Sequence, residues 1–175
     1  MDPMTQGSGT RQPDTDGARR DREGRPGKLT LLAIASGGGH WVQLCRLRPL
    51  LDEHDVHYVS VHRSYADDVK GRPLHRVRDA SRWDKLGLVV QALQVLWTVL
   101  RVRPDVVLST GAAPGFFGLA FGKLLGARTV WIDSLANVEE LSLSGRQARR
   151  YADLWLTQWP HLARPEGPRY LGAVL

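Results

Sequence analysis

Two glycine-bearing turns and one acidic strand end carry the residue types that could do chemistry in this chain. The first turn, Ser36-Gly37-Gly38-Gly39-His40, follows a short apolar run and precedes a helical pattern. Glycines let a backbone approach a ligand closely, and unpaired N–H groups at a helix start attract anions such as a diphosphate. His40 could bind a phosphate or a substrate there, or act as a general base. We predict an anion-binding turn, with a tight structural turn as the alternative.

The second turn is Ser109-Thr110-Gly111, followed closely by Pro114-Gly115. It predicts a second backbone cradle, so that both turns could hold one diphosphate; an ordinary strand-to-helix turn with a helix cap is the alternative. Asp133 ends an apolar run and could take a proton from an attacking hydroxyl. As a structural residue, it would instead bond nearby backbone N–H groups. Glu139 is a second candidate for the base.

Several other kinds of site are not indicated. The first turn lacks the Gly-Lys-Ser/Thr ending of a P-loop and the spacing of the dinucleotide-binding fingerprint. No Asp-x-Asp motif occurs within residues 28–175, and His54, His57, His62 and His75 are scattered. We therefore predict no bound metal and no cofactor, and the missing fingerprint argues against a nucleotide-binding oxidoreductase.

Strand and helix patterns alternate along the chain, which predicts an α/β fold with a Rossmann-like parallel sheet. The expected strands cover residues 29–35, 56–61, 74–77, 105–108, 128–132 and 153–157. The expected helices cover residues 41–53, 84–103, 116–125 and 146–151, and Pro49 should bend or end the first of them. Ligands of such sheets bind at the carboxyl ends of the strands. Both glycine turns and Asp133 should therefore meet at one edge.

Length and composition fit one globular domain with a terminal tail. Residues 28–175 form the predicted domain, and residues 1–27, which are rich in Gly, Pro, Asp and Arg, are predicted to be disordered. No apolar signal segment is visible near the start. The single cysteine, Cys45, cannot form an internal disulfide, which favours a reducing cytosolic setting.

The positive charge is concentrated around the most apolar helix. Residues 63–103 hold nine basic and four acidic residues, which account for five of the six net positive charges. A basic collar around an apolar helix suits an anionic membrane surface. The run without charged residues, residues 86–100, is mostly apolar but shorter than a bilayer requires. Shallow interfacial insertion and packing in the protein core are both open interpretations.

The motifs Trp131-Ile132-Asp133-Ser134, Leu141-Ser142-Leu143-Ser144-Gly145 and Gln158-Trp159-Pro160 occur in order. In these residues the chain resembles the membrane-associated subunit family of the bipartite UDP-N-acetylglucosamine transferase of dolichol-linked oligosaccharide synthesis. It is also similar to the bacterial PssD-type subunits of exopolysaccharide assembly. The glycine turn with its histidine, and Ser109-Thr110-Gly111, are similar to the amino-terminal half of the lipid II-forming N-acetylglucosaminyltransferase. The resemblance covers roughly residues 28–175.

The resemblance implies the acceptor-binding half of a GT-B glycosyltransferase whose donor-binding half is a separate chain. It implies transfer of a sugar from a UDP-sugar to a polyprenyl-diphosphate-linked acceptor at the cytoplasmic face of a membrane, without a metal. By position, residues 36–40 would line the acceptor diphosphate cleft, and Asp133 would lie near the reacting hydroxyl. The partner-docking tail would comprise Tyr170, Leu171, Gly172, Val174 and Leu175. The alternative is a non-catalytic subunit that recruits and activates the catalytic chain.

Overall fold

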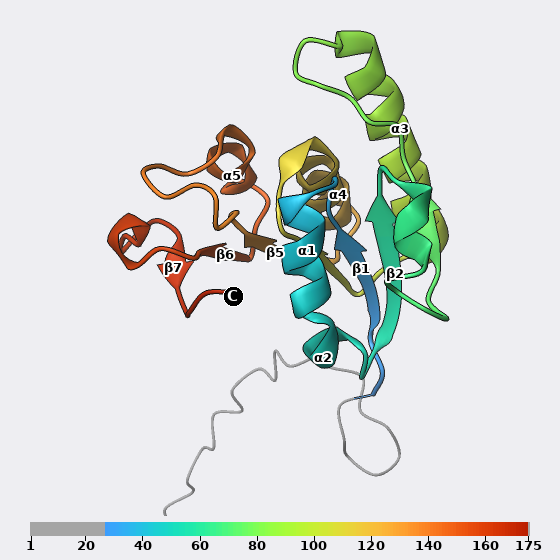
Figure 1. Cartoon of the computed structure of the whole chain (residues 1–175), viewed down its shortest axis with the longest axis horizontal. Coiled ribbons are helices and arrows are strands. Elements are labelled where there is room, and N and C mark those ends of the chain that lie inside the picture. The colour runs from blue at the N-terminus through green and yellow to red at the C-terminus, as the bar shows by residue number, and fades with distance from the viewer. Residues whose placement is uncertain (1–26, 175) are drawn as a thin grey trace, which may run out of the picture.

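The computed structural model describes residues 27–174 of the chain, which are coloured in Figure 1. The predicted disordered tail, except Gly27, and the predicted docking residue Leu175 lie outside the described residues. Within them, the predicted α/β architecture is confirmed. All neighbouring strands of the sheet pair in parallel.

The sheet has seven strands in the order β3-β2-β1-β4-β5-β6-β7. Their bounds are β1 Thr30–Ile34, β2 Asp55–Ser60, β3 Leu74–Arg76, β4 Val106–Ser109, β5 Arg128–Ile132, β6 Leu154–Thr157 and β7 Arg169–Tyr170. The chain runs outward from β1 to β3 and then crosses back to β4 on the other side of β1. This reversal opens a crevice at the carboxyl ends of β1 and β4, where open α/β sheets bind their ligands.

Helices cover both faces of the sheet (Figure 1). They are α1 Gly39–Arg46, α2 Arg48–Leu51, α3 Lys85–Val102, α4 Ala112–Leu124 and α5 Leu143–Ala148, with short 3-10 turns at Arg63–Ala66 and Pro160–Leu162. Side chains of β1 alternate between the two layers. Leu32 and Ile34 join a core with residues of α3, α4 and α5, whereas Leu31 and Ala33 join a core with residues of α1 and α2.

Three local differences from the predicted elements have simple causes. The expected helix over residues 41–53 is split at Leu47, because Pro49 lies in the first turn of α2. Helix α4 begins at Ala112 rather than at residue 116, because Pro114 also fits a first turn. Strand β7 was not predicted: its two residues pair with Leu156 and Thr157 of β6 and extend the sheet toward the C-terminus.

Helix α3 turns its apolar side chains away from the protein. Its cap is regular, since the Asp84 side chain accepts a hydrogen bond of 2.8 Å from the Gly87 N–H. The exposed large side chains lie at helical spacing: Leu86, Val89, Leu93, Trp97 and Leu100. The helix satisfies length and hydropathy criteria for crossing a membrane, criteria that buried core helices also meet, but only 28% of it is buried.

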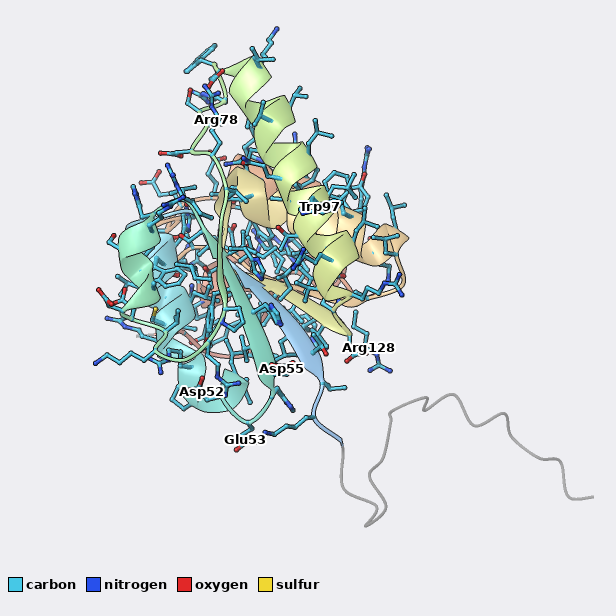
Figure 2. The ribbon with its side chains drawn as sticks, turned by 90° about the vertical axis from the view of Figure 1, so that its right-hand side faces the viewer. Asp52, Glu53, Asp55, Arg78, Trp97 and Arg128 are labelled. Carbon is cyan, nitrogen blue, oxygen red and sulfur yellow. The ribbon has the colours of Figure 1, made fainter. Side chains whose placement is uncertain are left out.

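Two glutamines of α3 bind the same backbone segment. The Gln91 amide donates to the Arg78 carbonyl at 2.6 Å, and the Gln94 side-chain oxygen accepts from the Arg78 N–H at 2.7 Å. Gln91 and Thr98 are buried. Figure 2 shows the segment with Arg78 beside one side of the helix, and Trp97 on its surface. Packing in the core thus accounts for one face of α3 and leaves the other uncovered.

Candidate functional site

A hollow of about 300 Å³ lies at the carboxyl edge of the sheet. The segments that follow β1, β4 and β5 all contribute to it. Its lining comprises Gly39, His40, Ala112, Ser134, Ala136, Asn137, Ser142, Leu143 and Ser144. The first glycine turn, the second glycine turn and the segment after Asp133 therefore meet, as their places at strand ends predicted.

His40 has the geometry of a proton acceptor. Its Nδ1 lies 3.1 Å from the Thr110 carbonyl oxygen. Because a carbonyl only accepts hydrogen bonds, Nδ1 must carry the proton, and Nε2 of the neutral ring keeps a free lone pair. Burial lowers the pKa of His40, against smaller raising contributions from the Thr110 hydrogen bond and the charge of Asp133. The imidazole is thereby kept neutral at pH 7 and can accept a proton.

The second glycine turn supports His40. The Thr110 hydroxyl donates to the His40 carbonyl at 2.8 Å, and the Ser109 hydroxyl accepts from the Gly111 N–H at 3.0 Å. A Cβ on Gly111 would lie 2.6 Å from His40 Cε1, and the φ of Gly111 is +138°, so this position requires glycine. Ser109 and Thr110 are fully buried. Because the Thr110 side chain bonds to His40 and the Ser109 side chain bonds to Gly111, the predicted diphosphate contact would be made by the backbone of this turn.

The first glycine turn also borders the hollow, and its residues Gly38 and Gly39 are exposed. The Gly38 N–H donates to the Tyr65 hydroxyl at 3.0 Å. The Ser36 carbonyl accepts from the Ser60 hydroxyl and the Val61 N–H, so Ser36 is tied to the neighbouring strand. Of the predicted diphosphate ligands in this turn, Gly39 and His40 line the hollow. Binding by the turn stays a prediction.

The contacts of Asp133 argue against the predicted role as base, and that role stays a prediction. It is 1% exposed, and its carboxylate accepts four hydrogen bonds. The donors are Trp131 Nε1 at 3.2 Å, Asn137 Nδ2 at 3.2 Å, the Ser142 N–H at 2.9 Å and the Ser142 hydroxyl at 2.5 Å. With its lone pairs occupied, this carboxylate cannot reach a substrate hydroxyl without breaking the loop. Its hydrogen bonds hold the loop of residues 134–142 instead. This agrees with the structural alternative, in which Asp133 bonds to nearby backbone N–H groups.

Other predicted residues lie elsewhere. Glu139, the second candidate base, is exposed and does not line the hollow. Among residues 27–174, no three His, Cys, Asp or Glu side chains gather as metal ligands would. The predicted absence of a metal stays a prediction. His57 and His75 form a ring-to-ring hydrogen bond of 3.0 Å on β2 and β3. None of them lies in the hollow.

The predicted docking tail follows the edge of the sheet. After β7, Tyr170 and Leu171 are 41% and 64% exposed, and Gly172 turns the chain with a φ of +124°. Val174 is then fixed from two sides: its N–H donates to Gln158 Oε1 at 2.8 Å, and its carbonyl accepts from Arg46 Nη1 at 3.2 Å. The tail therefore presents apolar side chains from a fixed backbone, and docking by it stays a prediction.

Sequence reasoning missed the two buried glutamines beneath the hollow, Gln43 and Gln158. Gln158 opens the Gln-Trp-Pro motif, which was noted only for its resemblance. The next residue, Trp159, donates from Nε1 to the Leu135 carbonyl at 2.9 Å. The Gln-Trp-Pro motif therefore marked this position, but it did not indicate which segments its side chains contact.

The chain has the fold of one half of a GT-B structure. A MurG from Acinetobacter baumannii has the same fold with a TM-score of 0.67 at 13% identity, over 80% of this chain and 44% of that one. A putative UDP-N-acetylglucosamine 2-epimerase from Listeria monocytogenes is similar with a TM-score of 0.58 at 12% identity, over 75% and 40% of the two chains. The chain thus spans less than half the length of these structures.

The family profile described as "Oligosaccharide biosynthesis protein Alg14 like" matches residues 75–174, and the chain belongs to this family. A mouse relative named UDP-N-acetylglucosamine transferase subunit ALG14 is 27% identical over 185 residues, which cover 84% of this chain and 83% of the relative. A Schizosaccharomyces pombe relative of the same name is 34% identical over 98 residues, covering 53% and 45%. The resemblance seen in the sequence is confirmed, and the family is one of glycosyltransferase subunits.

Proposed function

We propose that this chain is the acceptor-side, catalytic subunit of a two-part glycosyltransferase. It transfers N-acetylglucosamine or a related sugar from a UDP-sugar to a polyprenyl-diphosphate-linked acceptor. The observation that carries the proposal is His40: a neutral imidazole with a fixed tautomer that lines the hollow at the carboxyl edge of half a GT-B fold. The names of the relatives support the choice of donor.

In the proposed reaction a hydroxyl of the acceptor sugar attacks the anomeric carbon of the donor from the face opposite the departing UDP, which inverts that centre. His40 Nε2 takes the proton of the attacking hydroxyl as the new C–O bond forms. UDP leaves with the electron pair of the broken bond. Backbone N–H groups at the start of α1 hold the lipid diphosphate.

The donor-binding half is a separate chain in this proposal. A single Rossmann-like domain offers one wall of the cleft that a GT-B enzyme closes around both substrates. The exposed Tyr170 and Leu171 support docking of the partner at the tail, because their backbone is already anchored at Val174. Apolar side chains on a rigid backbone lose little entropy on binding.

The proposed place of action is the cytoplasmic face of a membrane, to which α3 attaches the protein peripherally. Five large apolar side chains share the outer face of this helix, and Trp83 just before it is 80% exposed. Lys85 and Arg101 are exposed near the two ends of the same helix. An apolar face with flanking cations fits the interface of an anionic bilayer, where a lipid-linked acceptor would be found.

Reconstitution with the donor-binding chain tests the split enzyme. The pure chain and the pure partner are each expected to be inactive in transfer from UDP-N-acetylglucosamine to a polyprenyl-diphosphate-linked sugar, and a mixture of the two is expected to be active. The measurement is radiolabelled sugar in the lipid fraction. Full activity of the partner alone would refute the proposed division of the site between two chains.

The pH dependence of the reconstituted pair tests the protonation state of His40. Because burial lowers the pKa of His40, its base form predominates at pH 7. We expect the acid limb of kcat/KM for the acceptor to have its midpoint below about 6.5, the ordinary histidine value. If kcat/KM already declined above pH 7, and His40→Gln left that decline unchanged, the assignment of His40 as the base would be contradicted.

A non-catalytic recruiting subunit is the second candidate. The carboxylate of Asp133 supports it, because four hydrogen bonds already engage the oxygens of one of the two predicted catalytic residues. The two candidates differ in what they require of His40: the catalytic subunit needs its imidazole for turnover, whereas the recruiting subunit does not.

A further inference from the structure

Two buried glutamines connect the hollow with the C-terminal tail. Gln43 on α1 is 6% exposed, and Gln158 after β6 is 3% exposed. Gln158 Nε2 donates to Gln43 Oε1 at 2.6 Å, although 115 positions separate the two residues in the chain. Buried amides away from water need partners for their donors and acceptors, so the segments around them are held in one arrangement.

Gln43 holds both walls of the hollow. Its Nε2 donates to the Gly39 carbonyl at 3.1 Å and to the Ser134 hydroxyl at 3.2 Å. Its Oε1 accepts from the Leu135 N–H at 3.0 Å as well as from Gln158. Gly39 and Ser134 both line the hollow, from segments that follow different strands. The distance between the glycine turn and the loop after Asp133 therefore depends on this one side chain.

Gln158 connects that arrangement to the tail. Its Nε2 also donates to the Asp133 carbonyl at 2.9 Å, and its Oε1 accepts the N–H of Val174 at 2.8 Å. An amide is required, because the position needs two donors and an acceptor on one side chain. Losing the Val174 N–H would leave a buried oxygen unpaired and free the amide to rotate away from Gln43.

We propose that Gln43 and Gln158 are positioning residues that couple the seating of the tail at Val174 to the shape of the acceptor hollow. A partner that engages the tail thereby organises the loop of residues 134–137 as well. The coupling itself follows from the hydrogen bonds; its consequence for acceptor binding rests on the proposed function.

Amide hydrogen exchange of the isolated chain tests the coupling without any activity. The reporters are the N–H groups of Leu135, Ala136 and Asn137, which bond to Gln43 or within the loop. Val174→Pro removes the N–H donor of the tail, and Gln158→Met removes the amide at similar volume. Each is expected to speed exchange of the reporters about tenfold, as loss of one buried hydrogen bond would.

Leu171→Ala is the matched control, because it truncates an exposed tail side chain and leaves the Val174 N–H in place. It should not alter exchange of the reporters. Unchanged reporter exchange in both Val174→Pro and Gln158→Met overturns the coupling. So does equal acceleration at Leu32 and Val59 in the core strands, which would indicate general destabilisation.

With the partner present, Val174→Pro is expected to raise the KM for the lipid-linked acceptor severalfold with little change in kcat. A merely structural role would lower the active fraction and hence kcat alone, and that result would overturn the coupling. If the wild-type pair has no transferase activity, the proposed function fails, and the exchange experiment still decides whether tail and hollow are coupled.

Discussion

Replacing His40 by alanine is expected to lower kcat of the reconstituted pair by about 10²–10⁴-fold, the usual contribution of a general base. The KM for the UDP-sugar should change little, since the donor binds the other chain in the proposed enzyme. Single-turnover measurements at saturating donor would show the loss in the chemical step. The expectation depends on Nε2 being the free nitrogen, which the Nδ1 bond to the Thr110 carbonyl dictates.

His40→Gln sharpens this test. A glutamine amide can still donate toward the Thr110 carbonyl but cannot take a proton, so it should lose as much activity as alanine. His54→Ala serves as the matched control, because His54 lies in the turn before β2, at the opposite end of the strands. Full activity of both His40 variants with the partner would leave the recruiting subunit as the correct interpretation.

The second large effect concerns α3. A double variant, Leu93→Asp with Trp97→Asp, is expected to lower binding to vesicles of phosphatidylcholine with phosphatidylserine by about 100-fold or more. It removes two apolar side chains and adds two negative charges, which the anionic lipid repels. Both side chains are at least 60% exposed, so the fold should tolerate the change. Sedimentation with vesicles measures the bound fraction.

Three comparisons support the interpretation of that result. Leu50→Asp alters a side chain that is 65% exposed on α2, away from α3 in Figure 1, and should bind vesicles like the wild type. Vesicles of phosphatidylcholine alone should bind more weakly, and added salt should weaken binding to anionic vesicles. A wild-type protein that does not bind anionic vesicles would remove the membrane role of α3.

Local patterns in the sequence were sufficient for the architecture. The apolar runs, the helical spacings and the glycine turns predicted six of the seven strands and the edge where the site lies. These features depend on neighbours in the chain, and parallel strands bring their carboxyl ends together whatever the details. Strand β7 was missed because a two-residue strand has no pattern of its own; pairing with β6 forms it.

Asp133 shows that local patterns can place a residue without predicting which groups its side chain bonds to. Its place at a strand end was correct, but a carboxylate acts as a base only if a lone pair is free. The donors that occupy its oxygens include Asn137 and Ser142, from a loop whose path no pattern predicted. His40 is the reverse case: the residue was found from its turn, and its tautomer was decided by Thr110, 70 positions away.

The sequence by itself determined the α/β fold, the family, the glycine turns and the charge around α3, because each is carried by composition or by residues close together in the chain. Only the tertiary structure decided which face of α3 is uncovered, since Gln91 is buried and both Gln91 and Gln94 bind the backbone of Arg78. It also decided the connection of the tail to the hollow through Gln43 and Gln158. Those contacts join distant segments, and hydrogen bonding between buried groups selects them only once the sheet has formed.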